Sequence, residues 1–218
     1  MNKNEAIKEI ERNLSESNLR KHCYAVGAIM RELALKLDKD PDEWEIAGII
    51  HDLDYEMTKD EVEMHAKKTV EMLGDRVDQD IKDAILAHND QKNLEKDIEI
   101  ALYAADQISG LITASVLVRP GKDIETLKVK SLKKKFKDKS FAAGADRERI
   151  KVIEELGIEL NEFFQIAIDG MKKEKEILGL DGQSEWYIMD TKFKESGFCE
   201  EIIGDITCFN NGFIYFFC

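Results

Sequence analysis

The sequence has few of the residues and motifs that interrupt helices or form phosphate-binding loops. Proline occurs only twice, at Pro41 and Pro120, and both positions suit the boundary of a helix. A glycine-rich loop of the G-x-x-x-x-G-K type is absent, and so is a G-x-S-x-G turn. These absences argue against a P-loop nucleotide-binding fold and against a serine hydrolase with a nucleophile elbow.

Cysteine is also scarce, and its four positions form no C-x-x-C pair: Cys23, Cys199, Cys208 and Cys218. Free thiols in a reducing compartment are the simplest interpretation.

We find no apolar run long enough to cross a bilayer. The segment 1–13 is polar and alternately charged, without the apolar region of a secretory signal. We therefore expect a cytoplasmic protein that has no membrane partner.

Positive charge is in the minority, with 32 basic against 45 acidic residues and a formal net charge of −13. An acidic surface repels phosphate backbones, so long nucleic acid is not an expected partner. Residues 128–139 are the exception, since seven lysines and one aspartate give them +6 and leave −19 on the rest. This run is either a solvated helix face or an anion-binding surface.

Helical patterns follow one another over residues 1–180, so we expect an all-α helical bundle in one domain. Asp40 before Pro41 is a good helix start, and Thr58 with Glu61 predicts a capping box. Apolar spacing and these signals predict helices over 16–37, from 41 into His51, and over 59–73, 78–89, 95–118, 146–156 and 158–178.

The last residues, 181–218, differ in composition and are expected to form a separate extension. They contain no Ala, Leu or Val but six of the ten phenylalanines. Two apolar runs, 202–209 and 213–217, flank Asn210-Asn211-Gly212, a pattern typical of a β-hairpin.

Histidine and aspartate carry the expected chemistry. All four histidines, His22, His51, His65 and His88, fall on predicted helices. Asp52 follows His51 directly, and Asp106 lies in the middle of an apolar helix. A carboxylate there is costly to bury unless a cation or strong donors accept it. Imidazole and carboxylate groups are ordinary ligands for divalent metals, and facing helices of a bundle can direct them into one cavity.

The order His22, His51-Asp52, His65, His88, Asp106 resembles the HD-domain superfamily of metal-dependent phosphohydrolases, which is all-helical. By its motifs the resemblance covers roughly residues 16–120. It implies that His22, His51, Asp52 and Asp106 bind one divalent ion. It also implies that His65 and His88 bind a second ion, with Asp52 bridging both. The alternative is a single ion, with His65 and His88 contacting substrate or supporting the ligands.

The resemblance has one departure, which concerns the substrate phosphate. Many relatives continue the His-Asp pair with Ile-Gly-Lys, and that lysine contacts phosphate. Here Leu53-Asp54-Tyr55 follows, with no lysine. Phosphate contacts are therefore expected from other basic side chains, namely Lys59, Arg119, Lys122, Lys134, Lys137 and Arg147.

The resulting hypothesis is a phosphohydrolase that uses metal-activated water on a small phosphorylated molecule such as a nucleotide. Asp52, Asp106 and His51 would be its catalytic residues. The ligand types do not distinguish Fe, Mn, Zn, Ni, Co and Mg. Two alternatives stay open: a di-iron oxygenase of the same fold, and a weakly active regulatory or binding module. A homo-oligomer is also left open.

Overall fold

The computed structural model describes residues 1–183, and within them the chain is helical with no named strand. The all-α expectation is confirmed. The expected hairpin lies outside the described residues, and the division at residue 180 stays a prediction. The described residues form ten α-helices: α1 (Lys3–Asn13), α2 (Ser17–Lys36), α3 (Pro41–Ile50), α4 (Lys67–Leu73), α5 (Gln79–His88), α6 (Asp97–Leu117), α7 (Val129–Lys137), α8 (Arg147–Lys151), α9 (Leu160–Lys173) and α10 (Lys175–Leu178).

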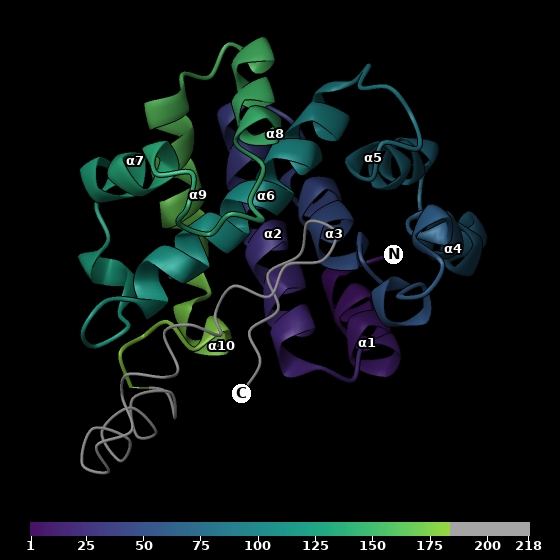
Figure 1. Cartoon of the computed structure of the whole chain (residues 1–218). Coiled ribbons are helices and arrows are strands. Elements are labelled where there is room, and N and C mark those ends of the chain that lie inside the picture. The colour runs from purple at the N-terminus through teal and green to yellow at the C-terminus, as the bar shows by residue number, and fades with distance from the viewer. Residues whose placement is uncertain (184–218) are drawn as a thin grey trace.

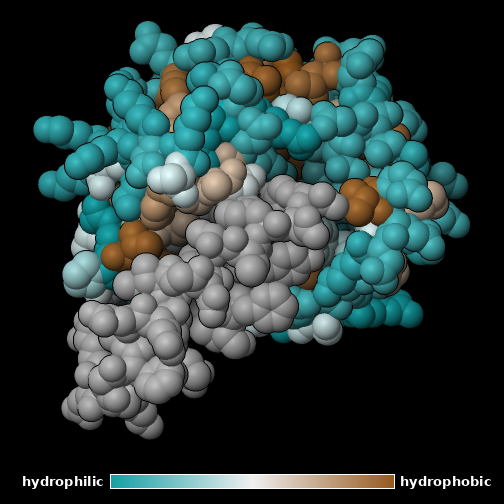
Figure 2. Space-filling model, viewed as in Figure 1, coloured by the Kyte–Doolittle hydropathy of each residue, from teal (hydrophilic) through white to brown (hydrophobic). Residues whose placement is uncertain are grey.

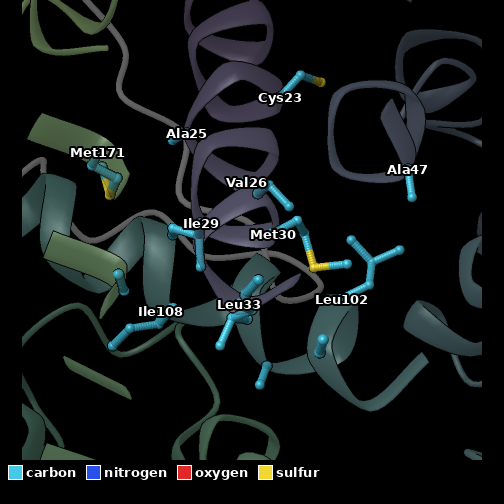
Figure 3. Packing of buried hydrophobic residues seen from close by; sticks show 14 of the residues in the cluster. Cys23, Ala25, Val26, Ile29, Met30, Leu33, Ala47, Leu102, Ile108 and Met171 are labelled. Atoms are coloured by element: carbon cyan, nitrogen blue, oxygen red, sulfur yellow. The ribbon is translucent and has the colours of Figure 1, made fainter. Parts of the chain in front are cut away.

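Helix α2 lies at the centre of the bundle, and α6 crosses it (Figure 1). Helices α1, α3, α4 and α5 lie to one side of this pair, and α7 and α9 lie to the other. Figure 3 shows Met30 of α2 directed toward Leu102 of α6, with Ala47 of α3 on the same side and Met171 of α9 on the opposite flank. All four side chains are buried, so α2 is enclosed by its neighbours.

Two glycines allow α2 and α3 to approach backbone to backbone. A Cβ atom on Gly48 would lie 2.7 Å from the Cα of Gly27, and a Cβ on Gly27 would lie 2.6 Å from Ile49 Cγ1. Both distances are too short for real atoms, so only glycine fits. This close approach sets how the N-terminal half of α2 lies against the C-terminal end of α3.

The start of α3 is confirmed by its cap. The Asp40 carboxylate accepts hydrogen bonds from the main-chain N–H groups of Asp42 and Glu43, at 2.9 and 3.2 Å. Pro41 occupies the first turn, where its missing N–H costs nothing. The helix ends at Ile50, so His51 and Asp52 follow in a tight turn.

The expected helix over 59–73 is wrong in its first half. The structure has two short 3-10 turns, Tyr55–Met57 and Val62–Met64, and α4 begins only at Lys67. The Thr58 hydroxyl donates to the main-chain carbonyl of Asp54 at 3.0 Å and does not cap a helix. His65 therefore lies on a loop and His51 in the turn after α3, contrary to expectation, whereas His22 and His88 lie on helices.

Two C-terminal helices are shorter than predicted. The pattern over 146–156 forms α8 and then a 3-10 turn, Val152–Leu156. The pattern over 158–178 divides into α9 and α10 at Glu174. Further 3-10 turns span Gly74–Arg76 and Ile124–Thr126.

The expectation that no apolar run is long enough to cross a bilayer is wrong for helix α6. Its 21 residues are long and apolar enough to cross a bilayer by length and composition, with a mean hydropathy of 1.4. However, 78% of that stretch is buried inside the bundle, and the helix carries Asp106 and Gln107 toward its interior. Its apolarity is that of a central core helix. Hydrophilic residues cover most of the face seen in Figure 2 outside the grey atoms.

Candidate metal centre

Four side chains from helices α2 and α6 and from the turn after α3 form a first group of donors. His22 comes from α2, His51 and Asp52 follow α3, and Asp106 comes from α6. His22 Nε2 lies 3.0 Å from Asp106 Oδ1, 3.3 Å from His51 Nε2 and 3.6 Å from Asp52 Oδ2. Donors that share one cation at ~2.1 Å lie roughly 3.0–3.4 Å from one another. The group therefore has the spacing of a metal site.

A second group shares Asp52 with the first. His65 Nε2 and His88 Nε2 each lie 3.3 Å from Asp52 Oδ1, whereas the first group faces Oδ2. Both groups, His22 with His51 and Asp52, and Asp52 with His65 and His88, have ligand atoms within 4.8 Å of one another. The two oxygens of one carboxylate thus face two separate sets of imidazoles.

Unsatisfied buried atoms support a cation at both positions. Within the described residues, neither oxygen of Asp52 makes a hydrogen bond, and nor does His88 Nε2. Buried polar atoms are normally paired, and an unpaired carboxylate is very costly. A divalent cation would satisfy these atoms, so the residues fit the metal that their chemistry implies.

The charge balance points the same way. Burial would raise the pKa of Asp52 and of Asp106, but the adjacent imidazoles hold both pKa values well below the ordinary range. Burial would lower the pKa of His51, but Asp52 and Asp106 raise it to about 10. Burial lowers the pKa of His88. The two carboxylates therefore require positive charge beside them, which a divalent cation can supply.

Three of the four imidazoles are oriented by a hydrogen bond at Nδ1, the ring nitrogen that points away from the centre. His51 Nδ1 lies 2.8 Å from the carbonyl of Gly48, and His88 Nδ1 contacts the carbonyl of Ile85. His22 Nδ1 lies 3.2 Å from the hydroxyl of Ser109. With Nδ1 as the donor to a carbonyl, the lone pair of Nε2 faces the centre.

Gln107 supports Asp106 and ties the centre to the following part of the chain. Its side-chain NH₂ donates to Asp106 Oδ2 at 2.7 Å, and its carbonyl accepts the main-chain N–H of Asp146 at 2.9 Å. Three residues after Asp146, Arg149 donates to the carbonyl of His88 at 3.2 Å. Helix α8 therefore braces ligands of both groups.

Residues 19–117 match the family model of the HD domain. The chain contains an HD domain. No curated protein and no solved structure matches this chain. HD domains are typically metal-dependent phosphohydrolases, and the buried His/Asp cluster is consistent with their divalent metal site. The six residues predicted as ligands all converge in this domain, whereas the braces from α8 lie outside the matched segment.

The basic residues predicted to bind phosphate do not converge in this way. Lys59 pairs with Glu16 at 2.9 Å. Arg119 donates to the carbonyl of Thr126 and the hydroxyl of Ser131, each at 3.0 Å. It follows the end of α6, roughly 20 Å along the helix axis from Asp106. Lys122 lies in the next turn with φ 46°. A phosphate bound at the metals is beyond the direct reach of Arg119.

Arg147 is buried and surrounded by main-chain carbonyls. Its guanidinium donates to the carbonyls of Phe136, Asp138, Phe141, Ala142 and Ala145. Burial lowers its pKa. These bonds hold the segment between α7 and α8, so Arg147 has a structural role, and its contact with phosphate stays a prediction. Lys134 and Lys137 are exposed on α7.

Sequence reasoning missed Asp54, Gln107, Ser109 and Arg149 as supports of the centre. Asp54 had a signal, since it is a second acid, two residues after Asp52, in an apolar stretch. Gln107 had a weaker one, as the polar residue that directly follows Asp106. Nothing in the sequence pointed to Ser109 or Arg149, because their partners are distant in the chain.

Proposed function

We propose that this HD-domain protein is a two-metal phosphohydrolase that acts on a small phosphorylated molecule, a nucleotide or another phosphoester. One observation carries the proposal: Asp52 directs Oδ2 toward His22 and His51 and Oδ1 toward His65 and His88. That arrangement suits two cations bridged by one carboxylate. When bound, such cations supply a more acidic water and positive charge for the phosphoryl oxygens.

The opening of the centre supports approach of the substrate at His22. The His22 side chain is 21% exposed, whereas those of the other five ligands are at most 5% exposed. A phosphoryl group would therefore meet the first donor group, and the second group would stay shielded from bulk water. Shielding strengthens charge interactions inside the site.

The two aspartates, Asp52 and Asp106, have different surroundings in the centre. Asp52 uses both of its oxygens toward the two donor groups. Asp106 Oδ2 accepts from Gln107, and Oδ1 lies 3.0 Å from His22 at the open side. Of the two aspartates, Asp106 therefore lies nearer the open side of the centre, and Gln107 keeps its carboxylate in orientation.

The test combines metal analysis with turnover under strict control of oxygen. The purified protein, loaded with Mn²⁺ or Fe²⁺, is expected to hold two ions per chain and to release phosphate from some nucleotides or phosphoesters without O₂. EDTA should abolish the release, and added metal should restore it. Asp106→Asn should lose turnover, and Asp169→Asn, at a carboxylate on α9 whose side chain is 47% exposed, is the matched control.

Other outcomes favour the alternatives. Turnover that requires O₂ and an iron-loaded centre would replace the proposal by the di-iron oxygenase. Metal binding with no turnover across the screen, and with a structural response to a bound nucleotide, would replace it by the regulatory module.

A further inference from the structure

We propose that Asp54, which belongs to neither donor group, decides whether the second metal ion binds, because it positions His65. The inference rests on the two-metal centre proposed above. Asp54 is a positioning residue in this scheme, acting only through His65 and the loop that carries it.

The contacts of Asp54 are all internal. Its side chain is 0% exposed, and Oδ1 lies 2.7 Å from His65 Nδ1. Oδ2 accepts the main-chain N–H of Thr69 at 3.0 Å. In return, the main-chain N–H of Asp54 donates to the Thr69 hydroxyl, also at 3.0 Å. The carboxylate is thus held on both sides and cannot swing toward the metals.

These contacts fix the tautomer of His65. A carboxylate only accepts hydrogen bonds, so His65 Nδ1 carries the hydrogen that Asp54 receives. The lone pair then lies on Nε2, the atom 3.3 Å from Asp52 Oδ1. Carboxylates behind ligating imidazoles commonly act in this way, and their loss typically costs about 10–100-fold in metal affinity.

His65 needs such a support more than His51 or His88 does. Those two use carbonyls three residues earlier in the same helical stretch, so the helix itself provides the partner. His65 instead follows a 3-10 turn with extended backbone, φ −58° and ψ 144°. The next residue, Ala66, has φ 70°, which is rare for a residue with a side chain. No helix repeat supplies an acceptor here.

Asp54 and Thr69 also close the base of the loop that carries His65. The reciprocal pair joins the residue before the loop to the first turn of α4, so residues 55–68 form a closed excursion. The side-chain amide of Asn89 adds one bond to the carbonyl of His65 at 3.3 Å. Asp54 therefore holds the His65 ring at Nδ1 and, through Thr69, also the base of the loop that carries it.

The first donor group has no such dependence. Its ligands stand on α2, on α6 and in the turn fixed by the α2–α3 contact. Loss of Asp54 should consequently remove the second ion and spare the first. The Asp54 side chain therefore determines whether the chain binds one metal ion or two.

The main experiment is a metal titration of Asp54→Asn by calorimetry, with elemental analysis after dialysis and Mn²⁺ as the probe. Wild type is expected to bind two ions. Asp54→Asn should bind one ion with unchanged affinity, with the second weakened at least about tenfold. The amide N–H would face His65 Nδ1 and favour hydrogen on Nε2, the wrong atom. Glu63→Gln, an exposed carboxylate in the same loop, should behave as wild type.

A double-mutant comparison and one measurement on wild type complete the test. His65→Ala should match Asp54→Asn, and the double variant should lose nothing further at the second site. In wild type loaded with diamagnetic Zn²⁺, where Nε2 is free to bind the ion, ¹⁵N resonances of His65 should report hydrogen on Nδ1, which tests the inference even if Asp54→Asn does not fold.

The inference is overturned if His65 carries its hydrogen on Nε2 in wild type, or if Asp54→Asn binds both ions normally. Equal weakening of both ions in a folded Asp54→Asn protein would also overturn it. A wild type that binds fewer than two ions would reject the two-metal proposal itself, so the two failures are distinguishable.

Discussion

At the scale of single residues, the molecule is organised around buried carboxylates that hydrogen bonds alone do not satisfy. Asp52 and Asp106 are both buried among imidazoles, and the two oxygens of Asp52 make no hydrogen bond within the described residues. Burial of such groups opposes folding unless positive charge accompanies them. The stability of this region and its metal affinity are therefore linked.

Asp52 is the residue whose change should affect both donor groups at once. Asp52→Asn keeps the shape but removes the charge that both groups share, so metal content should fall from two ions per chain to nearly none. His88→Ala, by contrast, should leave the first ion. Elemental analysis after dialysis checks this, with exposed Asp60→Asn as the control. Retention of one tight ion by Asp52→Asn would contradict a bridging role.

Arg147 should matter for stability. Arg147→Ala leaves five main-chain carbonyls without their donor, so we expect a loss of about 2 kcal/mol or more in the free energy of unfolding. Urea denaturation measures the loss, and exposed Lys151→Ala on the same helix is the control. A variant as stable as wild type but weaker for substrate would instead support the phosphate role expected from the sequence.

At the scale of elements, the contact between α2 and α3 sets the distance between two ligands. Gly27 lies five residues after His22, and Gly48 lies three residues before His51. The carbonyl of Gly48 also accepts from His51 Nδ1. The glycine contact and the metal centre are therefore parts of one geometry.

Gly48→Ala tests this coupling because helix propensity alone predicts that the substitution stabilises the protein, whereas the contact with Gly27 predicts that it destabilises the protein. Alanine in a helix normally stabilises by roughly 0.5–1 kcal/mol relative to glycine. Here the added Cβ would lie 2.7 Å from Gly27, so we expect destabilisation of about 1–3 kcal/mol and weaker metal binding. Thermal unfolding and metal titration measure the two effects, with Lys8→Ala on the exposed face of α1 as the control. An unchanged variant would show that the helices separate freely.

At the scale of the whole molecule, charge is distributed unevenly. Lysines elsewhere pair with carboxylates, as Lys39 does with Asp97 and Lys96 with Asp80. Within residues 1–183, no ion pair joins any lysine of 128–139 to an acid, although Lys135 lies over the ring of Phe141. The segment after α7 returns to the metal centre through the bond between Asp146 and Gln107. Within the described part of the chain, the lysines of helix α7 thus carry positive charge that no acid pairs, and the segment that follows this helix leads back to the site.

This charge should help to capture an anionic substrate. Lys134→Ala and Lys137→Ala should raise KM or lower kcat/KM by about one to two decades, since a charge-assisted phosphate contact is worth roughly 1.5–3 kcal/mol. Metal content should not change, and KM for wild type should rise with ionic strength. Steady-state kinetics on the true substrate decide, with exposed Lys67→Ala as the control. Full activity in both variants would make the lysine run a solvated face.

The sequence by itself determined the helical class, the start of α3 and the six candidate ligands. Helix periodicity, the Asp40-Pro41 cap and acids in apolar surroundings are local signals, which single residues and short spacings carry. The ligand order could be recognised because each ligand type is chemically distinctive.

Only the tertiary structure decided how these residues are supported. Asp54 holds His65 on a loop where a capping pattern predicted a helix, because a buried carboxylate gains more from His65 and Thr69 than Thr58 gains from capping. Arg147 and Arg149 have equal charge and neighbouring positions, yet one is enclosed by carbonyls and the other braces His88. Such roles depend on partners distant in sequence, and local patterns contain no information about which distant groups will meet.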